Sequence, residues 1–181
     1  KLARFVFDLF RLAPRSEVHE VERAREFAPV KDAAGEDSFE TARALVYLDR
    51  FREIGWSLQR GRLMALADLW KPDVIWAEAN SIGGPNIEAL QAEGLPVNSF
   101  TTTAQSKGPL IESLALAFER QEISILNDPV LIGELLAYTM DRLPSGRFQY
   151  SAPVGGHDDT VIALALAWYG AVNSGIGISF V

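Results

Sequence analysis

Four carboxylates stand where the surrounding sequence predicts burial. Asp32 lies on or just after a predicted strand, Glu78 lies near the end of the most apolar predicted strand, and the pair Asp158 and Asp159 opens a strongly apolar helix. An ionised carboxylate in apolar surroundings is costly unless a cation or hydrogen bonds compensate it. Bound divalent cations would compensate all four at once, so this pattern favours a metal site.

Mg²⁺ or Mn²⁺ is the kind of ion that such a set of side chains would hold. Both take oxygen ligands in octahedral geometry and are often held by a few carboxylates together with substrate phosphates. Two such ions about 4 Å apart stabilise the attacking water and the leaving oxygen of an in-line phosphodiester cleavage. The chain has no cysteine, so any metal must have oxygen or imidazole ligands. The hypothesis is two-metal phosphodiester hydrolysis.

Each acid also has a purely structural interpretation. Asp158 or Asp159 can cap the apolar helix, although capping does not require two consecutive acids. Glu78 can be exposed at a strand end and pair with a base from elsewhere in the chain. Asp32 can be a turn residue, because Ala33-Ala34-Gly35 follows it. The combination therefore carries more weight than any one member.

Two basic side chains accompany the acids. His157 precedes the Asp158-Asp159 pair and is a general acid, a donor that orients a ligand, or an ordinary residue at a helix start; a ligand role is the minority interpretation. Lys107 lies at a predicted helix start, where a lysine is either exposed or reaches a scissile phosphate. The Ser81-Ile82-Gly83-Gly84 turn is a weak candidate for a phosphate cradle, because a tight strand-to-helix turn explains its glycines equally well.

The predicted strands form an antiparallel meander, then two strands separated by helices, then a hairpin around the breakers Pro144–Gly146. The strand at Asp73–Ala79 is nearly continuous in apolar residues, as expected for a central strand covered on both faces. In chain order the predicted strands are Phe27–Asp32, Ala44–Asp49, Arg50–Trp56, Asp73–Ala79, Leu95–Thr101, Ala137–Leu143 and Arg147–Ala152.

The predicted helices alternate with the later strands. The helix at Asp128–Tyr138 has Asp128 as its N-cap and Pro129 in its first position, and Gly94 closes a shorter helix. The predicted helices begin at Ser57 and then span Asn86–Glu93, Ser106–Glu122, Asp128–Tyr138 and His157–Tyr169. The sequence thus predicts an α/β fold, a mixed sheet with helices on both faces. Residues 1–26 are expected to form a separate segment, a linker remnant, before a domain at 27–181.

Composition limits the function classes. With 24 acidic and 17 basic residues the formal net charge is -7, which argues against binding nucleic acid by general cationic attraction alone. It does not exclude DNA, because carboxylates that hold divalent cations contribute to the negative charge. The longest apolar run, Val161–Tyr169, is about half the ~20 residues that span a bilayer, and no signal peptide is evident. We expect a soluble intracellular domain.

Four segments together carry a resemblance to a known family. They are W-A-E-A-N-S-I-G-G-P at Trp76–Pro85, F-T-T-T-A-Q-S-K at Phe100–Lys107, L-P-S-G-R-F-Q-Y at Leu143–Tyr150 and G-G-H-D-D-T-V-I-A-L-A-L-A-W at Gly155–Trp168. In this order they resemble the C-terminal nuclease domain of bacteriophage terminase large subunits. The resemblance runs from about Ala44 to Gly170, and the combination is specific although each piece alone is not.

The resemblance implies an RNase H-like fold and a metal-dependent endonuclease with two Mg²⁺ or Mn²⁺ ions. It implies that the enzyme cuts concatemeric double-stranded viral DNA during packaging, in the host cytoplasm at the procapsid. The implied partners are the terminase ATPase domain of the full-length chain, the small subunit and the portal, with no membrane. Carried over by position, Glu78 matches the acid that ends the central strand, and the His-Asp-Asp motif supplies Asp158 and Asp159, of which either can hold the essential ion.

The first acid of the family is assigned to Asp32, with Asp37 as the fallback. Lys107 is assigned to the catalytic set on the same resemblance, and the hairpin around Pro144–Gly146 resembles the extra β-hairpin that the family carries beside its active site. DNA contacts by scattered arginines are expected to be few and sensitive to salt. These arginines are Arg60, Arg62, Arg142 and Arg147.

Two other functions remain open on sequence alone. A Holliday-junction resolvase or another RNase H-like nuclease would share the acids but not the Thr-Thr-Ala-Gln-Ser-Lys and Pro-Ser-Gly segments. A non-catalytic assembly module of a packaging motor would use the same carboxylates only for caps and turns, and would show no response to metal.

Overall fold

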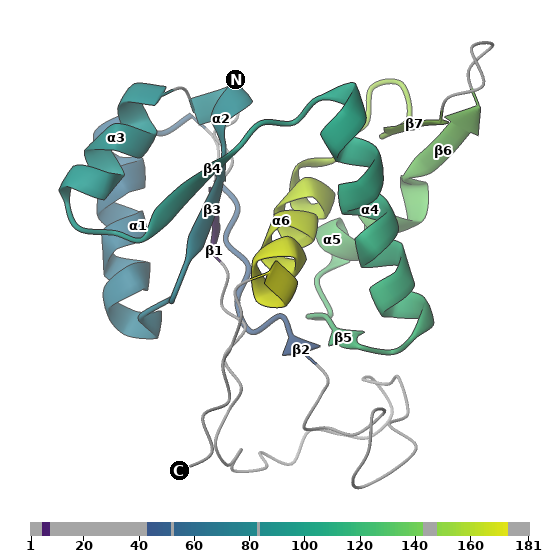
Figure 1. The fold of residues 1–181 in the computed structure, drawn as a ribbon, viewed down its shortest axis with the longest axis horizontal. Helices are drawn as coiled ribbons and strands as arrows, with labels where there is room; N and C mark the ends of the chain where they lie inside the picture. The colour runs from purple at the N-terminus through teal and green to yellow at the C-terminus, as the bar shows by residue number, and fades with distance from the viewer. Residues whose placement is uncertain (1–4, 8–42, 52, 83, 143–147, 174–181) are drawn as a thin grey trace, which may run out of the picture.

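The computed structural model describes residues 5–7, 43–51, 53–82, 84–142 and 148–173 (Figure 1). In this part of the chain a small sheet separates two groups of helices, which cover its opposite faces. Helices on both faces of a sheet were predicted from the sequence, and the structure confirms them. No helix among these residues has the length and apolar character needed to cross a membrane.

The sheet is built around β3, which spans Ile75–Glu78. Strand β4 (Val97–Phe100) lies parallel to it, with Glu78 opposite Phe100, as predicted for strands separated by helices. On its other edge β3 pairs antiparallel with β1 (Phe5–Phe7). Ile75 and Ala77 of β3 are completely buried against α1 and α3, and Trp76 between them packs against the cluster around α6 on the other face. These contacts confirm a central strand covered on both faces.

The first face of the sheet is covered by α1 (Trp56–Trp70) and α3 (Gly84–Ala92), with the single turn of α2 (Ala79–Ile82) between β3 and α3. Buried residues of α1 and α3 pack against β3 in one apolar cluster. Helix α3 is followed by Gly94 with φ +86, a left-handed conformation that glycine adopts without strain. Gly94 was predicted to close this helix, and the structure confirms that.

The second face is covered by α4 (Ala104–Glu119), α5 (Pro129–Ala137) and α6 (Asp159–Asn173). Thr103 and Ser106 form a capping box at the start of α4, and Asp128 caps α5 by accepting from two backbone amides. The Asp128 cap and Pro129 at the first position of α5 confirm the sequence prediction. Helix α6 is buried along most of its length, and its Trp168 indole donates to Ser113 Oγ of α4 at 3.0 Å.

Two further strand pairs lie outside this sheet. Strand β2 (Arg43–Ala44) pairs in parallel with β5 (Ile123–Ser124). Strands β6 (Thr139–Arg142) and β7 (Phe148–Ser151) form the predicted antiparallel hairpin. The hairpin projects beyond α4 and α5 in Figure 1.

The predicted meander is not reproduced in the described residues. The strand expected at Ala44–Asp49 is reduced to β2, and the described residues of Arg50–Trp56 contain no strand, while Phe27–Asp32 lies outside the described residues. Side chains of α1 explain the difference: Gln59 Nε2 donates to the Ile54 carbonyl at 2.7 Å, and the Arg62 guanidinium pairs with Asp49. The Ile54 carbonyl, which a strand would use in sheet pairing, accepts from Gln59 instead, and the segment lies against α1 as a loop.

Replacing Leu166 by alanine tests whether the packing of α6 holds the second face together. Leu166 is 0% exposed in the cluster around α6, and Leu136 at the end of α5 is 84% exposed. We expect Leu166→Ala to lower the free energy of unfolding by about 2–5 kcal/mol, because it leaves a cavity. We expect the matched variant Leu136→Ala to change it by less than about 0.5 kcal/mol. Urea unfolding followed by circular dichroism measures both; equal losses would contradict this packing.

Candidate functional site

Three element ends meet at one end of the fold. Strand β3 runs towards Glu78, while α4 and α6 begin at the same end and run back along the sheet (Figure 1). Helix α6 packs on β3 through the rings of Trp76 and Tyr169, whose centroids are 5.0 Å apart. The side chain of Asn80 connects the chain after β3 to the chain after β4. Its Nδ2 donates to the Thr102 backbone carbonyl at 2.6 Å, and its Oδ1 accepts from the Thr102 backbone amide at 3.2 Å. The predicted Glu78, Lys107 and Asp158-Asp159 positions therefore share this end.

Two of the predicted acids are buried there. Glu78, the last residue of β3, is 3% exposed, and Asp159, the first residue of α6, is 8% exposed. Carboxylates are rarely buried to this extent unless other groups compensate their charge. Exposure at a strand end, the structural alternative for Glu78, is therefore not what the fold shows.

Lys107 and Asp158 form the best-defined pair of the site. The Lys107 ammonium donates to Asp158 Oδ2 at 2.9 Å, and it lies 5.7 Å from the centre of the Tyr138 ring. Burial works against the charged ammonium, but the hydrogen bond to Asp158 and the neighbouring Tyr138 outweigh it, so the pKa of Lys107 is raised. Lys107 is thus a protonated, half-buried cation at the site, and not a freely exposed surface lysine.

His157 accompanies the other acid of the pair. Its Nδ1 lies 4.0 Å from Asp159 Oδ2, and its side chain is half exposed. The distance suits a charge interaction if the imidazole is protonated, but it exceeds a direct hydrogen bond.

Glu134 of α5 is a residue of this region that the sequence analysis missed. Its Oε2 accepts from both the amide and the hydroxyl of Thr160, at 2.8 and 2.6 Å, and its Oε1 lies 3.6 Å from the Arg50 guanidinium. One signal was available in the sequence: Glu134 is the single charged residue in the otherwise apolar helix PVLIGELLA. A single acid in an otherwise apolar helix indicates that a hydrogen-bond donor or a basic group lies beside it, but the sequence does not identify that group.

The hairpin is fastened to α4 by Tyr150. Its hydroxyl donates to Glu112 Oε1 at 2.5 Å, and its ring lies against Gly108, where a Cβ would meet the ring at 3.5 Å. This bond raises the pKa of Tyr150 to about 12, with burial adding to the effect. The contact holds β7 beside the first turns of α4, which also carry Lys107.

Several predicted site elements are not described by the structure. Asp32, its fallback Asp37 and the hairpin turn Pro144–Gly146 lie outside the described residues. Within residues 43–51, 53–82, 84–142 and 148–173, no three His, Asp or Glu side chains are close enough together to hold a metal ion. The structure therefore brings Lys107 to Asp158 and His157 to Asp159, and it places Glu78 at the same end of the fold.

The described residues nevertheless fit a hard divalent cation by their chemistry. Glu78, Asp158 and Asp159 offer carboxylate oxygens, the ligands that Mg²⁺ and Mn²⁺ prefer, and Glu78 and Asp159 are buried where a cation would offset their charge. The Lys107 ammonium already pairs with Asp158, so a positive charge is stable at this position. This set of oxygen ligands suits magnesium or manganese better than a soft metal ion that prefers thiolate ligands.

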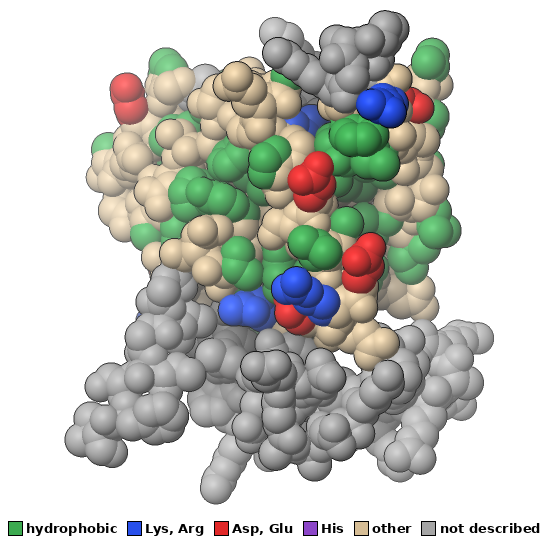
Figure 2. Space-filling model, turned by 45° about the vertical axis from the view of Figure 1, so that its right-hand side comes forward, with side chains coloured by type: hydrophobic (Ala, Val, Ile, Leu, Met, Phe, Trp, Pro, Cys, Tyr) green, Lys and Arg blue, Asp and Glu red, His purple; other side chains and the backbone are tan. Residues whose placement is uncertain are grey.

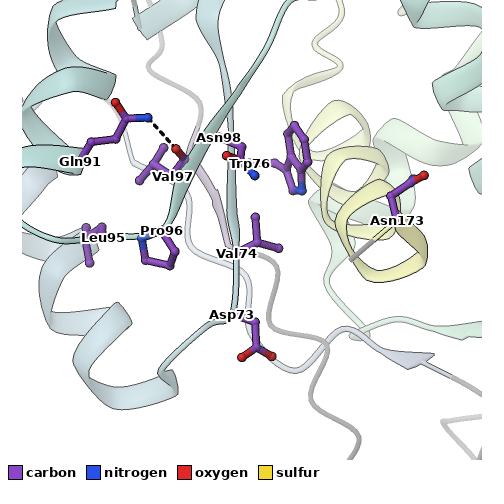
Figure 3. Close-up of a pocket in the computed structure, with 9 residues that line it drawn as sticks. All are labelled: Asp73, Val74, Trp76, Gln91, Leu95, Pro96, Val97, Asn98 and Asn173. Carbon is purple, nitrogen blue, oxygen red and sulfur yellow. Dashed lines mark hydrogen bonds between the residues drawn. The ribbon is translucent and has the colours of Figure 1, made fainter. Parts of the chain in front are cut away.

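A pocket of about 520 Å³ lies away from these acids (Figure 3). It is bounded by the residues that precede and open β3 and β4, including Asp73 and Pro96, and by Asn173 at the end of α6. Because Glu78 ends β3 and Asp159 begins α6, the pocket and the acids lie at opposite ends of these elements. None of the predicted site residues that the structure describes lines it.

The chain is similar in sequence to a phage terminase. It is 33% identical over 126 residues to the terminase large subunit of Thermus virus P23-45, a match that covers 69% of this chain and 26% of that protein. The chain thus spans about a quarter of the length of this curated relative. No protein-family model matches the chain.

Solved structures agree with the sequence match. The large terminase nuclease from the thermophilic phage G20c superposes with a TM-score of 0.61 at 31% identity, covering 67% of this chain and 65% of that one. The large terminase nuclease domain of Thermus phage P74-26 gives a TM-score of 0.59 at 30% identity, covering 70% and 66%. The chain is related to the nuclease domain of phage terminase large subunits. Its α/β fold is accordingly that of a terminase nuclease relative.

Two other findings accompany this relationship. The G20c terminase nuclease has been crystallised with bound cobalt, with bound magnesium and with bound zinc. Part of the chain is also 38% identical over 93 residues to UDP-N-acetylglucosamine diphosphorylase 2 of Arabidopsis thaliana, a match that covers 50% of this chain and 18% of that protein. The similarity in three dimensions is to the terminase nucleases.

Titration of the tyrosines tests the contact between the hairpin and α4. The chain has four tyrosines, and we expect Tyr150 to ionise with a pKa of about 12, because Glu112 accepts its proton in a hydrogen bond. A raised folded-state pKa means that this bond stabilises the fold fully below pH of about 10 and ceases to do so as the pH rises through about 12. Ultraviolet absorbance against pH measures the ionisation.

Two variants assign the late step of that titration. Tyr150→Phe should remove it, and Glu112→Ala should bring it down towards the ordinary tyrosine pKa of about 10. A late step that persists unchanged in both variants would belong to another tyrosine and would refute the contact.

Proposed function

We propose that the chain is the nuclease domain of a phage terminase large subunit, a metal-dependent endonuclease that cuts double-stranded viral DNA during packaging. The observation that carries the proposal is the gathering of Glu78, Asp159 and the Lys107–Asp158 pair at one end of a terminase-nuclease fold. Their residue types are those needed for phosphodiester cleavage. The RNase H-like arrangement of the sheet is part of this proposal.

In the proposed enzyme Glu78, Asp158 and Asp159, together with Asp32, hold two Mg²⁺ or Mn²⁺ ions. When bound, such ions activate water and stabilise the developing charge on the phosphate. The protein supplies the rest: buried β3 fixes Glu78, the start of α6 presents the aspartate pair, and α4 holds Lys107 beside Asp158. The Lys107 ammonium is placed to contact a phosphate oxygen, and its raised pKa keeps it protonated.

The basic side chains form no continuous track on the face that Figure 2 shows. Among the coloured residues, Lys and Arg groups lie near the top and near the bottom of this face, with hydrophobic and acidic groups between the two places. Two of the arginines expected to contact DNA are engaged within the protein, Arg60 with Asn86 and Arg62 with Asp49. We therefore propose that the domain makes few phosphate contacts and binds DNA weakly.

Such weak binding fits a domain that other parts of a packaging machine hold on its substrate. We therefore assign substrate gripping to a terminase ATPase domain of the full-length chain, with the small subunit and the portal as further partners. Procapsids in the host cytoplasm are the proposed place of action.

Thermal melting with and without Mn²⁺ tests the metal site. A ligand at about 100 times its Kd stabilises the fold by about 2.7 kcal/mol, and we expect a gain of this order in the unaltered protein. Glu78→Ala and Asp158→Ala should abolish the gain, because each removes a ligand. Glu119→Ala, an exposed acid in the last turn of α4, should retain it.

The outcomes separate the candidate functions. Absence of a Mn²⁺-dependent shift in the unaltered protein would remove the nuclease proposal and favour a non-catalytic assembly module. A shift that survives in both acid variants would place the ion elsewhere. Cleavage of four-way junctions in preference to linear duplex DNA would favour a resolvase-like nuclease.

The first acid is tested by a pair of variants. We expect Asp32→Ala to abolish Mn²⁺-dependent nicking of plasmid DNA and Asp37→Ala to leave it nearly unchanged, since Asp32 is assigned as the ligand. Agarose gels measure the nicked product over time. The opposite result would transfer the role to Asp37, and full activity in both variants would exclude this segment from the site.

A further inference from the structure

Glu134 is the one ionisable side chain of an otherwise apolar helix. Its side chain is 10% exposed, and its neighbours in α5 are the apolar residues of the helix PVLIGELLA. A carboxylate buried to this extent is stable only where donors satisfy its oxygens. The groups that donate to Glu134 therefore indicate which part of the structure it stabilises.

The donors belong to the first turn of α6. Glu134 Oε2 accepts from the Thr160 amide at 2.8 Å and from the Thr160 hydroxyl at 2.6 Å, across 26 positions of sequence. The first amides of a helix have no partner within the helix, and a negative charge beside them is favoured by the helix dipole. Arg50, 3.6 Å from the other oxygen, offsets part of the Glu134 charge.

The anchored residue is next to the proposed metal ligands. The Asp158 carbonyl accepts from the Ile162 amide at 2.9 Å, so Asp158 stands at the N-cap position, with Asp159 and then Thr160 following it into the helix. A rotation or fraying of this turn would displace both aspartates. The hydrogen bonds to Thr160 therefore also restrict the orientation of the Asp158 and Asp159 side chains.

The start of α6 receives a hydrogen-bond acceptor from another helix. Thr103 caps α4 and Asp128 caps α5 with their own side chains, at the N-cap position of each helix. In α6 a side chain from another helix accepts from the Thr160 amide, and the side chain at the N-cap position, Asp158, accepts from Lys107.

We propose that Glu134 is a positioning residue for the metal site, fixing the first turn of α6 so that Asp158 and Asp159 point correctly. The inference rests on the proposed function, because it assigns a metal to these aspartates. Groups that orient metal ligands through hydrogen bonds typically change metal affinity by about 10–100-fold when they are removed.

Mn²⁺ titration by calorimetry tests the proposal on three variants of the full chain. Glu134→Ala should weaken binding by about tenfold or more, because it frees the first turn of α6. Glu134→Gln retains an amide oxygen that can accept from Thr160, so it should restore affinity to within about threefold of the unaltered protein. Asp128→Ala is the matched control: it removes the cap of the same helix α5, and it should leave Mn²⁺ affinity within about twofold.

Hydrogen exchange supplies a readout that does not involve the metal. Glu134→Ala should speed exchange of the Thr160 amide, and Asp128→Ala should not. Faster exchange with unchanged Mn²⁺ affinity would reduce Glu134 to a structural cap and overturn the inference, while the metal site itself would stand. No Mn²⁺ binding by the unaltered protein would overturn the proposed function and this role together.

A second variant keeps the test decisive if Glu134→Ala does not fold. Thr160→Val removes the hydroxyl donor and leaves the amide, so it should weaken Mn²⁺ binding by a smaller factor, about threefold. Mn²⁺ affinity equal to that of the unaltered protein in Thr160→Val would refute the positioning role.

Discussion

Burial of α6 along most of its 15 residues is the constraint on which the arrangement of the site depends. Its side chains fill the space between the sheet and the helices α4 and α5, and the Trp168 indole is tied to Ser113. A helix packed in this way has little freedom to shift along its axis. Its first turn must therefore lie at the end of the sheet where β3 stops, which brings the Asp158-Asp159 pair and Glu78 to the same end of the fold.

The same constraint creates an electrostatic problem. Carboxylates as buried as Glu78 and Asp159 lose hydration, which raises the free energy of the folded state. The dipole of α6 favours the aspartates at its start, and Lys107 pairs with Asp158. Bound divalent cations would add further positive charge beside these carboxylates. Carboxylate burial and the proposed metal binding are therefore linked. The relationship to terminase nucleases, one of which has been solved with magnesium, agrees with this chemistry.

Elements that depend on local sequence patterns could be predicted from the sequence. Features that depend on contacts between side chains far apart in the sequence could not. The apolar run of β3, the Asp128-Pro129 start of α5 and the apolar helix α6 were all foreseen, because cap residues and periodicity act within a few positions. The loop before α1 was read as strand, since nothing local shows that Gln59 and Arg62 bind it. Glu134 and Tyr150 were missed for the same reason: their partners lie 26 and 38 positions away. The first acid of the site was the hardest residue to assign from the sequence. Asp32 precedes the stretch that resembles the family, and Pro29 and Lys31 interrupt the strand pattern around it.

A crystal soaked in Mn²⁺ tests the central claim most directly, since the anomalous signal of manganese locates the ion without assuming its ligands. The account predicts a strong peak at the end of β3, about 2.1 Å from oxygens of Glu78 and of Asp158 or Asp159, with the Lys107 ammonium displaced from Asp158 or bonded to its other oxygen. An anomalous map with no peak at this end of the sheet, or with its peak at Asp73 at the opposite end, would contradict it.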